Sequence, residues 1–543
     1  MTLVACRDRD NFRTPTHERV SAFSALPSAP LPPRGAASSD VAVSASALGS
    51  STSLNEAPVA SNEPGDDADS SLAQVQDGSE SNVANQDTAS GATNEDGAAL
   101  SDSKLYSIAI ETFVRARPNR SGKLLGYLRV GEAVRRSAES VSSDGCKDGW
   151  YAVEPMGYVC NGSAATLDPN AKLLTYAAPG ARRGEPMPFA YAFVRPKVPH
   201  YYYVMPSEAD IRRIEGADAL ASIRTAYQNP DPNLDVLGPP SDAPQDLLDG
   251  GRIPRPQGTA PRLRFKFHTG RAEPRTRVGI SRWFEHNQRR WVITSQLDLV
   301  AMDRLRIVRP PTLRGVELQP GQQLPVGFVR PATATGYRYD ESGSVSETVR
   351  LTRHQGFRLT GEKKQSGGKN LVATDDGLWI PEGQLTLVSP RSSVPTFVKS
   401  DTLRWLDISI RDQTLVAYQG KQPLYATLVS TGAGGMSDPE TSRATPRGLF
   451  AIFTKHVTAK MSGDEVGAEY HIDDVPYVQY FHKGYALHAA FWHDNFGRVQ
   501  SSGCVNLSPV DAAWVFEFTS PDVPKNWHGR YVKSGGTPVL IRP

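Results

Sequence analysis

The residues best equipped for chemistry are Cys504 and His488, which lie 16 positions apart in the segment LHAAFWHDNFGRVQSSGCVNLSP, residues 487–509. A thiol of ordinary pKa is mostly protonated at neutral pH, so a cysteine nucleophile needs an adjacent base, and His488 is the natural candidate. Ser502 and Gly503 leave the backbone before Cys504 unencumbered, so the amide N–H groups of Gly503 and Cys504 could converge on a tetrahedral oxyanion. The pattern predicts acyl transfer through a cysteine acyl-enzyme.

The elements expected to position these residues are β-strands. Strand-like runs occupy residues 405–410, 413–418 and 425–430, with a short Gly-containing turn at 419–421 between the second and the third. The C-terminal part of the chain, residues 401–543, is therefore predicted to open with a meander of antiparallel strands.

The line RWLDISIRDQTLVAYQGKQPLYATLVSTG, followed by TPRGLF at residues 445–450, resembles the opening of the L,D-transpeptidase catalytic domain, also called the YkuD domain. That family carries a His upstream of a Ser-His-Gly-Cys block, at a spacing that includes the one found here. The resemblance implies a mainly β fold with a catalytic β-sandwich or barrel over residues 401–543. It also implies that Cys504 is the nucleophile, that His488 is the base, and that the backbone carbonyl of Ala489 orients the His488 ring.

One position departs from the family pattern, because Ser502 stands where the family has the His of this block. In the family that residue lines the oxyanion and acyl-donor pocket, so the change puts efficiency in doubt more than reaction type; a Ser can still donate one hydrogen bond. The resemblance further marks Trp492 and Asn506 as lining the pocket. For both, a packing role is the alternative. We add His493 as a neighbour, with an exposed loop position as its alternative, and Tyr480 on the strand that leads to His488.

The reaction implied by the resemblance is attack on the amide before the terminal D-residue of a peptidoglycan tetrapeptide stem, release of D-Ala, and acyl transfer to an amine. The acceptor is a second stem peptide or a Lys of an envelope protein, and the sequence does not choose between them. Neither a metal nor an organic cofactor is implied. His482, His488 and His493 lack the spacing of a metal hydrolase site.

Two other readings of the segment remain open. A cysteine peptidase is one, although such enzymes place Cys before His in the chain and His488 comes first here. The second is a catalytically impaired, peptidoglycan-binding or structural envelope protein, for which Ser502 would be the sign of decay.

Residues 105–165 hold about five short strand-like runs, and the phrasing VRARPNRSGKLLGYLRVGEAV with GWYAVEPMGYVC resembles bacterial SH3-like β-barrels. Such domains often accompany cell-wall enzymes, so this unit is expected to bind wall or to act as a spacer. Cys146 and Cys160 lie fourteen apart within it. They predict a local disulfide if the compartment is oxidising, with two buried thiols as the alternative.

The rest of the chain divides by composition. Residues 1–104 are expected to form a disordered tether, residues 166–262 an irregular Pro- and Tyr-rich connector with a short helix near 207–227, and residues 263–395 a β-rich module. The polar stretch 455–475 is expected to be an irregular lid over the site, or a disordered insertion.

Net charge and the N-terminus bear on location. The chain carries +2 overall, yet residues 35–103 hold twelve acidic and no basic residues, so the remainder is basic and fits an anionic partner. No nucleic-acid-binding motif accompanies that charge. Cys6 closes the run LVAC, which resembles a lipobox truncated at its start, and no apolar stretch is long enough to span a membrane. We expect a monomer of the periplasm or cell envelope, attached to membrane only through lipid.

Overall fold

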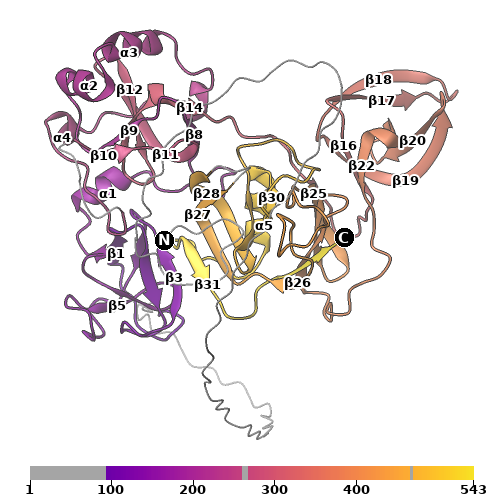
Figure 1. Ribbon diagram of the computed structural model, residues 1–543. Helices are drawn as coiled ribbons and strands as arrows, with labels where there is room; N and C mark the ends of the chain where they lie inside the picture. Colours follow the sequence, from indigo (N-terminus) through magenta and orange to yellow (C-terminus); the bar gives the residue numbers. More distant parts are fainter. Residues whose placement is uncertain (1–92, 260–266, 465–468) are drawn as a thin grey trace, which may run out of the picture. The chain divides into compact units, whose positions relative to one another are not determined.

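The computed structural model describes residues 93–259, 267–464 and 469–543, and within these residues β-strands dominate (Figure 1). The mainly β fold class is thus confirmed. The predicted lipidation site Cys6 and most of the predicted tether lie outside the described residues. Residues 93–104 of the predicted tether belong to the described part, where the Asp96 carboxylate accepts a hydrogen bond from the Gly157 amide at 2.6 Å and Leu100 is buried. No helix of the described part is long and apolar enough to cross a membrane.

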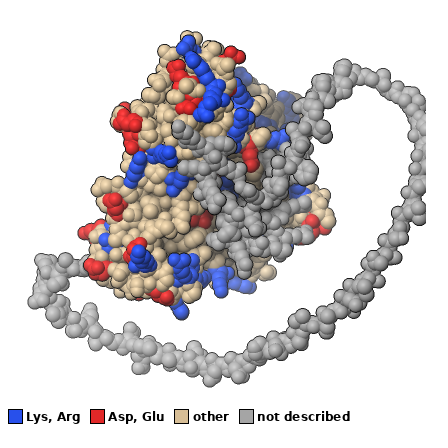
Figure 2. Space-filling model, turned by 60° about the vertical axis from the view of Figure 1, so that its left-hand side comes forward, with Lys and Arg blue, Asp and Glu red and all other residues tan. Residues whose placement is uncertain are grey.

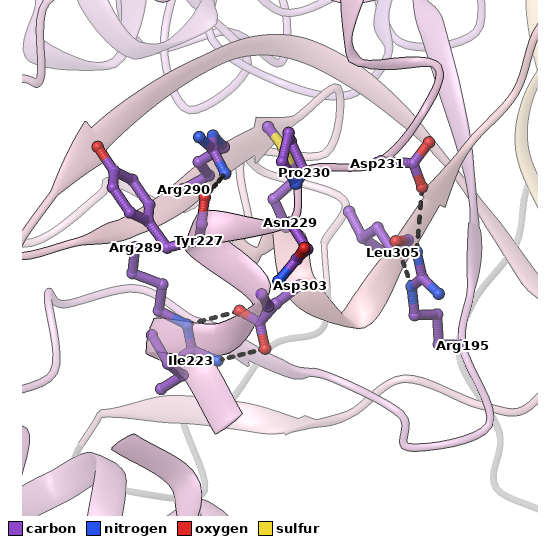
Figure 3. A pocket seen from close by; sticks show the side chains of 12 residues that line it. Arg195, Ile223, Tyr227, Asn229, Pro230, Asp231, Arg289, Arg290, Asp303 and Leu305 are labelled. Atoms are coloured by element: carbon purple, nitrogen blue, oxygen red, sulfur yellow. Dashed lines mark hydrogen bonds and ion pairs between the residues drawn. The ribbon is translucent and has the colours of Figure 1, made fainter. Parts of the chain in front are cut away.

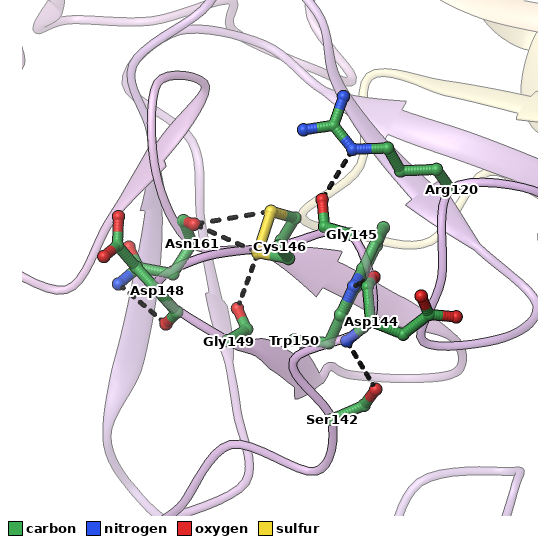
Figure 4. Close-up of a disulfide and its surroundings, with 10 residues drawn as sticks. Arg120, Ser142, Asp144, Gly145, Cys146, Asp148, Gly149, Trp150 and Asn161 are labelled. Carbon is green, nitrogen blue, oxygen red and sulfur yellow. Dashed lines mark hydrogen bonds between the residues drawn. A yellow bond between two sulfur atoms is a disulfide. The ribbon is translucent and has the colours of Figure 1, made fainter.

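The first unit consists of short strands that carry the disulfide. Cys146 and Cys160 are joined, as predicted, and the half-cystine at 146 is buried beside Trp150 (Figure 4). The SH3-like identity of this unit stays a prediction. Its strands are β1 (Lys104–Ser107), β2 (Thr112–Arg115), β3 (Leu124–Leu128), β4 (Ala133–Arg135), β5 (Trp150–Ala152), β6 (Tyr158–Cys160) and β7 (Ala165–Thr166).

Residues 190–307, here called module 1, form a strand-rich unit where the sequence predicted an irregular connector followed by strands. The predicted single helix near 207–227 is two helices, since Gly216, at φ 110°, ends the first of them. The elements, with α1 just before the module, are α1 (Lys172–Ala177), β8 (Ala190–Val194), β9 (His200–Tyr202), α2 (Glu208–Glu215), α3 (Ala219–Gln228), η1 (Leu234–Leu237), α4 (Gln245–Leu248), β10 (His268–Arg271), β11 (Thr276–His286), β12 (Arg289–Thr294), β13 (Leu299–Ala301), η2 (Met302–Arg304) and β14 (Leu305–Ile307).

Residues 326–388, here called module 2, form a seven-stranded sheet of their own. The elements are β16 (Val326–Val329), β17 (Thr333–Tyr339), β18 (Val345–Thr352), β19 (Gly356–Ser366), β20 (Lys369–Thr374), β21 (Trp379–Pro381), η3 (Glu382–Gln384) and β22 (Leu385–Val388).

The two modules repeat one strand connectivity. In module 1, β8 pairs with β11 and β14, and β11 with β12; in module 2, β16 pairs with β19 and β22, and β19 with β20. The sequences AFVRP at 192–196 and GFVRP at 327–331 occupy matching places. The β-rich region predicted at residues 263–395 therefore holds the second copy and only the end of the first, which begins within the predicted connector and carries the helices α2 to α4 between β9 and β10.

The C-terminal unit opens with the predicted meander. Its strands β23, β24 and β25 pair in sequence order, and the turn between the last two is Gly420-Lys421, with Gly420 at φ 54°. The elements, with the linker strand β15 that pairs with β25, are β15 (Val316–Glu317), β23 (Arg404–Ser409), β24 (Thr414–Gln419), β25 (Gln422–Leu428), β26 (Gly448–Ala451), β27 (Thr454–Asp464), β28 (Glu469–His482), β29 (Tyr485–Ala489), β30 (Val505–Leu507), α5 (Pro509–Phe518), β31 (Gly529–Tyr531) and β32 (Pro538–Arg542).

Residues 455–464 and 469–475, which belong to the stretch predicted as an irregular lid or a disordered insertion, are regular strand instead: they lie in β27 and β28 of a long antiparallel hairpin (Figure 1). This hairpin continues into neighbouring strands on both edges. On one edge β28 pairs with β11 of module 1, and on the other β27 pairs with β31, which in turn pairs with β3. Strands from elsewhere in the chain thus pair with the backbone N–H and C=O groups of the hairpin. The polar local sequence gave no reason to expect this stretch in a sheet.

Candidate active site

His488 lies on β29, which pairs with β28 on one side and in parallel with β30 on the other. His488 is opposite Asn506 in that parallel register, and Cys504 precedes Asn506 by two positions. Because side chains alternate along a strand and partners opposite each other share a face, His488, Asn506 and Cys504 are assigned to one face. Tyr480, opposite Ala486 two positions before His488, falls on the same face.

The hydrogen bond of His488 fixes its tautomer. Nδ1 lies 3.0 Å from the carbonyl oxygen of Ala489, which can only accept, so Nδ1 carries the proton and Nε2 keeps its lone pair. Burial lowers the pKa of His488 to about 4, and the Ala489 carbonyl raises it in part. The ring is neutral at neutral pH, the form that a general base requires. The contact with Ala489 is the one that the sequence analysis expected.

The turn before Cys504 is built around Gly503, whose φ of 123° disfavours any side chain. A Cβ at this position would lie 2.6 Å from the Tyr485 ring, so glycine is also needed for packing. Ser501, which the sequence analysis did not single out, accepts a hydrogen bond from the Gly503 amide at 3.1 Å and donates one to the Cys504 carbonyl. Thr445 donates to the Gly503 carbonyl at 2.8 Å, so two hydroxyls hold the turn.

This geometry bears on the predicted oxyanion donors. The Gly503 amide is engaged by Ser501 in this conformation, so it would have to exchange that partner before it could bind an oxyanion. Ser502 is half-buried in the same turn. The roles predicted for Gly503 and Ser502 stay predictions.

Cys504 is present here as half of a disulfide, and its side chain is 1% exposed. Its sulfur lies 4.0 Å from the Gly484 carbonyl, in the turn that joins β28 to β29. A disulfide sulfur is not a thiolate, so any nucleophilic chemistry belongs to the reduced form of this residue.

Of the predicted pocket residues, Trp492 and His493 lie in the connection between β29 and β30, Asn506 lies on β30, and Tyr480 lies on β28. The Trp492 ring stacks on His488 with centroids 5.8 Å apart, and His493 Nε2 lies 2.9 Å from the Asn506 side-chain nitrogen. The pKa of His493 is lowered to about 4 by burial first, then by His488 and Arg277. Tyr480 has its ring edge-on to His456, 5.8 Å away, on the neighbouring strand. The substrate-binding roles of all four stay predictions.

Residues of both modules contact the connection between β29 and β30, and the sequence analysis did not identify these residues. The Arg277 guanidinium of module 1 lies 5.6 Å from the Trp492 ring centre, and His354 of module 2 lies 3.3 Å from the Asp494 carboxylate. Tyr191 of module 1 stacks on Phe491 at 4.2 Å. No local signal could have revealed these residues, because each lies more than a hundred positions from the segment it contacts.

A separate cavity of about 200 Å³ lies in module 1, and none of its lining residues is a predicted site residue (Figure 3). Its charges are matched internally: Arg289 reaches Asp303 at 2.7 Å, and Arg195 reaches Asp231 at 3.0 Å. Within the described residues, no group of three or more His, Cys, Asp or Glu side chains could hold a metal. On the face drawn in Figure 2, Lys and Arg side chains are spread among Asp and Glu side chains.

Comparison with known proteins points to the same segment. Residues 403–541 match the model of the L,D-transpeptidase catalytic domain, YkuD. YciB of Bacillus subtilis (strain 168), named as a candidate L,D-transpeptidase, is 27% identical over 123 residues, which are 21% of this chain and 59% of that protein. The chain therefore spans less than two thirds of this relative's length.

Two solved structures match part of the chain. An L,D-transpeptidase from Xylanimonas cellulosilytica DSM 15894 is 23% identical with a TM-score of 0.20, covering 26% of this chain and 62% of that one. An L,D-transpeptidase from Mycobacterium smegmatis is 17% identical with a TM-score of 0.21, covering 44% of this chain and 89% of that one.

Proposed function

We propose that this protein is a peptidoglycan L,D-transpeptidase that acts through Cys504 and His488, because residues 403–541 match the model of the L,D-transpeptidase catalytic domain. The observation that carries the proposal is the tautomer of His488. Its Nδ1 is committed to the Ala489 carbonyl, so the basic Nε2 is left for a proton on the face it shares with Cys504.

The reaction starts from the reduced form of Cys504. His488 Nε2 takes the thiol proton, and the thiolate attacks the carbonyl carbon of the amide between an L-centre and the terminal D-residue of a tetrapeptide stem. The C–N bond breaks, the imidazolium gives its proton to the departing D-Ala amine, and a thioester remains on Cys504. Neutral His488, favoured by its lowered pKa, is the form that begins this cycle.

The second half of the cycle forms the product amide. An acceptor amine attacks the thioester carbonyl, the C–S bond breaks, and the proton lost by the amine leaves through His488 while the sulfur departs as thiolate. The acceptor is the side-chain amine of a second stem or a Lys of an envelope protein. Both amines suit the same chemistry.

The proposal also assigns a location. Peptidoglycan lies outside the cytoplasmic membrane, so we place the protein in the periplasm or cell envelope. The disulfide between Cys146 and Cys160 supports an oxidising compartment.

The test is to incubate the full chain, after treatment with a reductant, with disaccharide-tetrapeptide and to identify the products by mass. We expect loss of D-Ala and formation of cross-linked dimer, and no product from the Cys504→Ser variant. If the reduced wild-type chain leaves the substrate unchanged and binds it intact, a wall-binding protein without transpeptidase activity is the correct assignment. Hydrolysed stems without cross-links would instead indicate a cysteine peptidase.

A further inference from the structure

Arg277 reaches the candidate active site from outside the catalytic domain. It lies on β11 of module 1, where its backbone is opposite Phe193 of β8 on one side and Ile472 of β28 on the other. The parallel pairing with β28 ties this position directly to the hairpin of the catalytic domain.

The Arg277 side chain packs against the aromatic rings of Phe193 and Trp492. It is 9% exposed, and its guanidinium carbon lies 5.1 Å from the Phe193 ring centre and 5.6 Å from that of Trp492. Trp492 also stacks on His488, so the guanidinium and the proposed catalytic base share one indole as a neighbour. The N–H groups of a guanidinium lie in the guanidinium plane. A guanidinium that packs on aromatic rings can therefore donate two parallel hydrogen bonds to a carboxylate in that plane.

The duplication shows that the module fold does not require this arginine. Phe193 of AFVRP corresponds to Phe328 of GFVRP in module 2, and the residue opposite Phe328 is Gly356. Module 2 builds the same pairing of its strands with glycine at that position. Module 1, whose strand β11 pairs with β28, is the copy that has an arginine at this position.

We propose that Arg277 binds a carboxylate of the stem peptide that the site acylates. The inference rests on the proposed function and adds a residue of module 1 to the recognition of that peptide. In a stem with diaminopimelate before the terminal D-residue, two carboxylates next to the scissile amide qualify, that of the terminal D-residue and that on the diaminopimelate side chain. Both present the same group to a guanidinium.

The experiment measures steady-state kinetics of the reduced full chain with three tetrapeptide donors: one with free carboxylates, one with a C-terminal amide, and one with an amidated side-chain carboxylate. For Arg277→Met we expect KM for the free donor to rise about ten- to a hundredfold with kcat little changed, the loss typical of a charge-assisted contact. The donor that lacks the bound carboxylate should have a high KM already in the wild type and should lose little more in R277M. That donor identifies which carboxylate is bound.

Arg306→Met is the matched control, because Arg306 also lies over the Phe193 ring, at 4.5 Å, but is exposed on β14. It should leave KM unchanged for every donor. Arg277→Lys keeps the charge and covers the case in which R277M fails to fold; it should lose affinity for the free donor only in part.

The outcomes separate the two proposals. An equal rise in KM for all donors, or a fall in kcat alone, would mean that Arg277 only supports the site, and the inference would fail while the proposed function stood. Absence of turnover with every donor in the reduced wild type would overturn the proposed function, and the inference with it.

Discussion

Arg129 and Asp474 form an ion pair of 2.8 Å in which both side chains are buried, at 8% and 1% exposure. Arg129 follows β3 of the first unit, whereas Asp474 lies on β28 of the hairpin β27–β28, at φ 58°. Thr458 also donates to the Asp474 carboxylate at 2.8 Å. Burial works against the ionised carboxylate, yet Arg129 and these donors hold the pKa of Asp474 below its usual value. A buried ion pair thus joins the first unit to the hairpin next to the site.

Removal of one partner should be strongly destabilising. Arg129→Met leaves the Asp474 carboxylate buried without its cation, and such losses cost about 3–5 kcal/mol. We expect a clear fall in the urea midpoint of R129M, measured by tryptophan fluorescence during urea denaturation. Arg135→Met removes an exposed ion pair with Asp102 and should leave the midpoint unchanged. Equal midpoints for the two variants would show that the buried pair contributes nothing beyond a surface pair.

The proposed roles of Cys504 and His488 predict different effects of their substitution on the rate of acylation. Cys504→Ser should abolish the covalent adduct with a carbapenem, whereas His488→Ala should slow its formation about 10²- to 10⁴-fold, the usual contribution of a positioned base. Intact-mass spectrometry of the reduced chain over time measures both. His286→Ala, at the end of β11, is the control histidine and should acylate at the wild-type rate. An unchanged rate in H488A would remove His488 from the mechanism.

The sequence predicts those elements of the C-terminal unit that local patterns determine. The meander β23–β25 follows from strand-like runs and a Gly turn, whereas the parallel pairing of β29 with β30 near His488 and Cys504 is a finding of the structure that their spacing did not predict. Local patterns failed at the hairpin β27–β28, whose buried polar residues find partners far away in the sequence. His456, for example, bonds the Tyr127 hydroxyl at 3.0 Å. A polar stretch without visible partners resembles a loop, so only the tertiary structure explains these strands.

The disulfide of the first unit should contribute measurable stability. Cys146 and Cys160 are separated by 14 positions, and for a loop of this size cross-linking of the unfolded chain is worth about 3 kcal/mol. The Cys146→Ala, Cys160→Ala double variant should therefore lower the urea midpoint measured without reductant. Reductant should lower the wild-type midpoint toward that of the variant and should change the variant less. A variant as stable as the oxidised wild type would show that this cross-link has no stabilising role.

Lys455 predicts a dependence of stability on pH. It is 1% exposed on β27, where its ammonium donates to the carbonyls of Phe516 and Thr519 at the end of α5. Burial lowers its pKa to about 7. Below that pH both the folded and the unfolded chain hold the proton, so the cost of the buried charge is fully present. Between about pH 7 and the normal lysine range only the unfolded chain binds it, so stability should rise with pH.

The Lys455→Met variant isolates this contribution. Urea denaturation at pH 7, 8, 9 and 10 should show the wild type gaining up to about 1.4 kcal/mol per pH unit relative to K455M, the limit for one proton. Lys460→Met is the control, because Lys460 is on the same strand with 58% of its side chain exposed, and this variant should keep the wild-type rise. Parallel pH profiles for wild type and K455M would mean that Lys455 stays charged in the folded chain, held by the two carbonyls at the helix end.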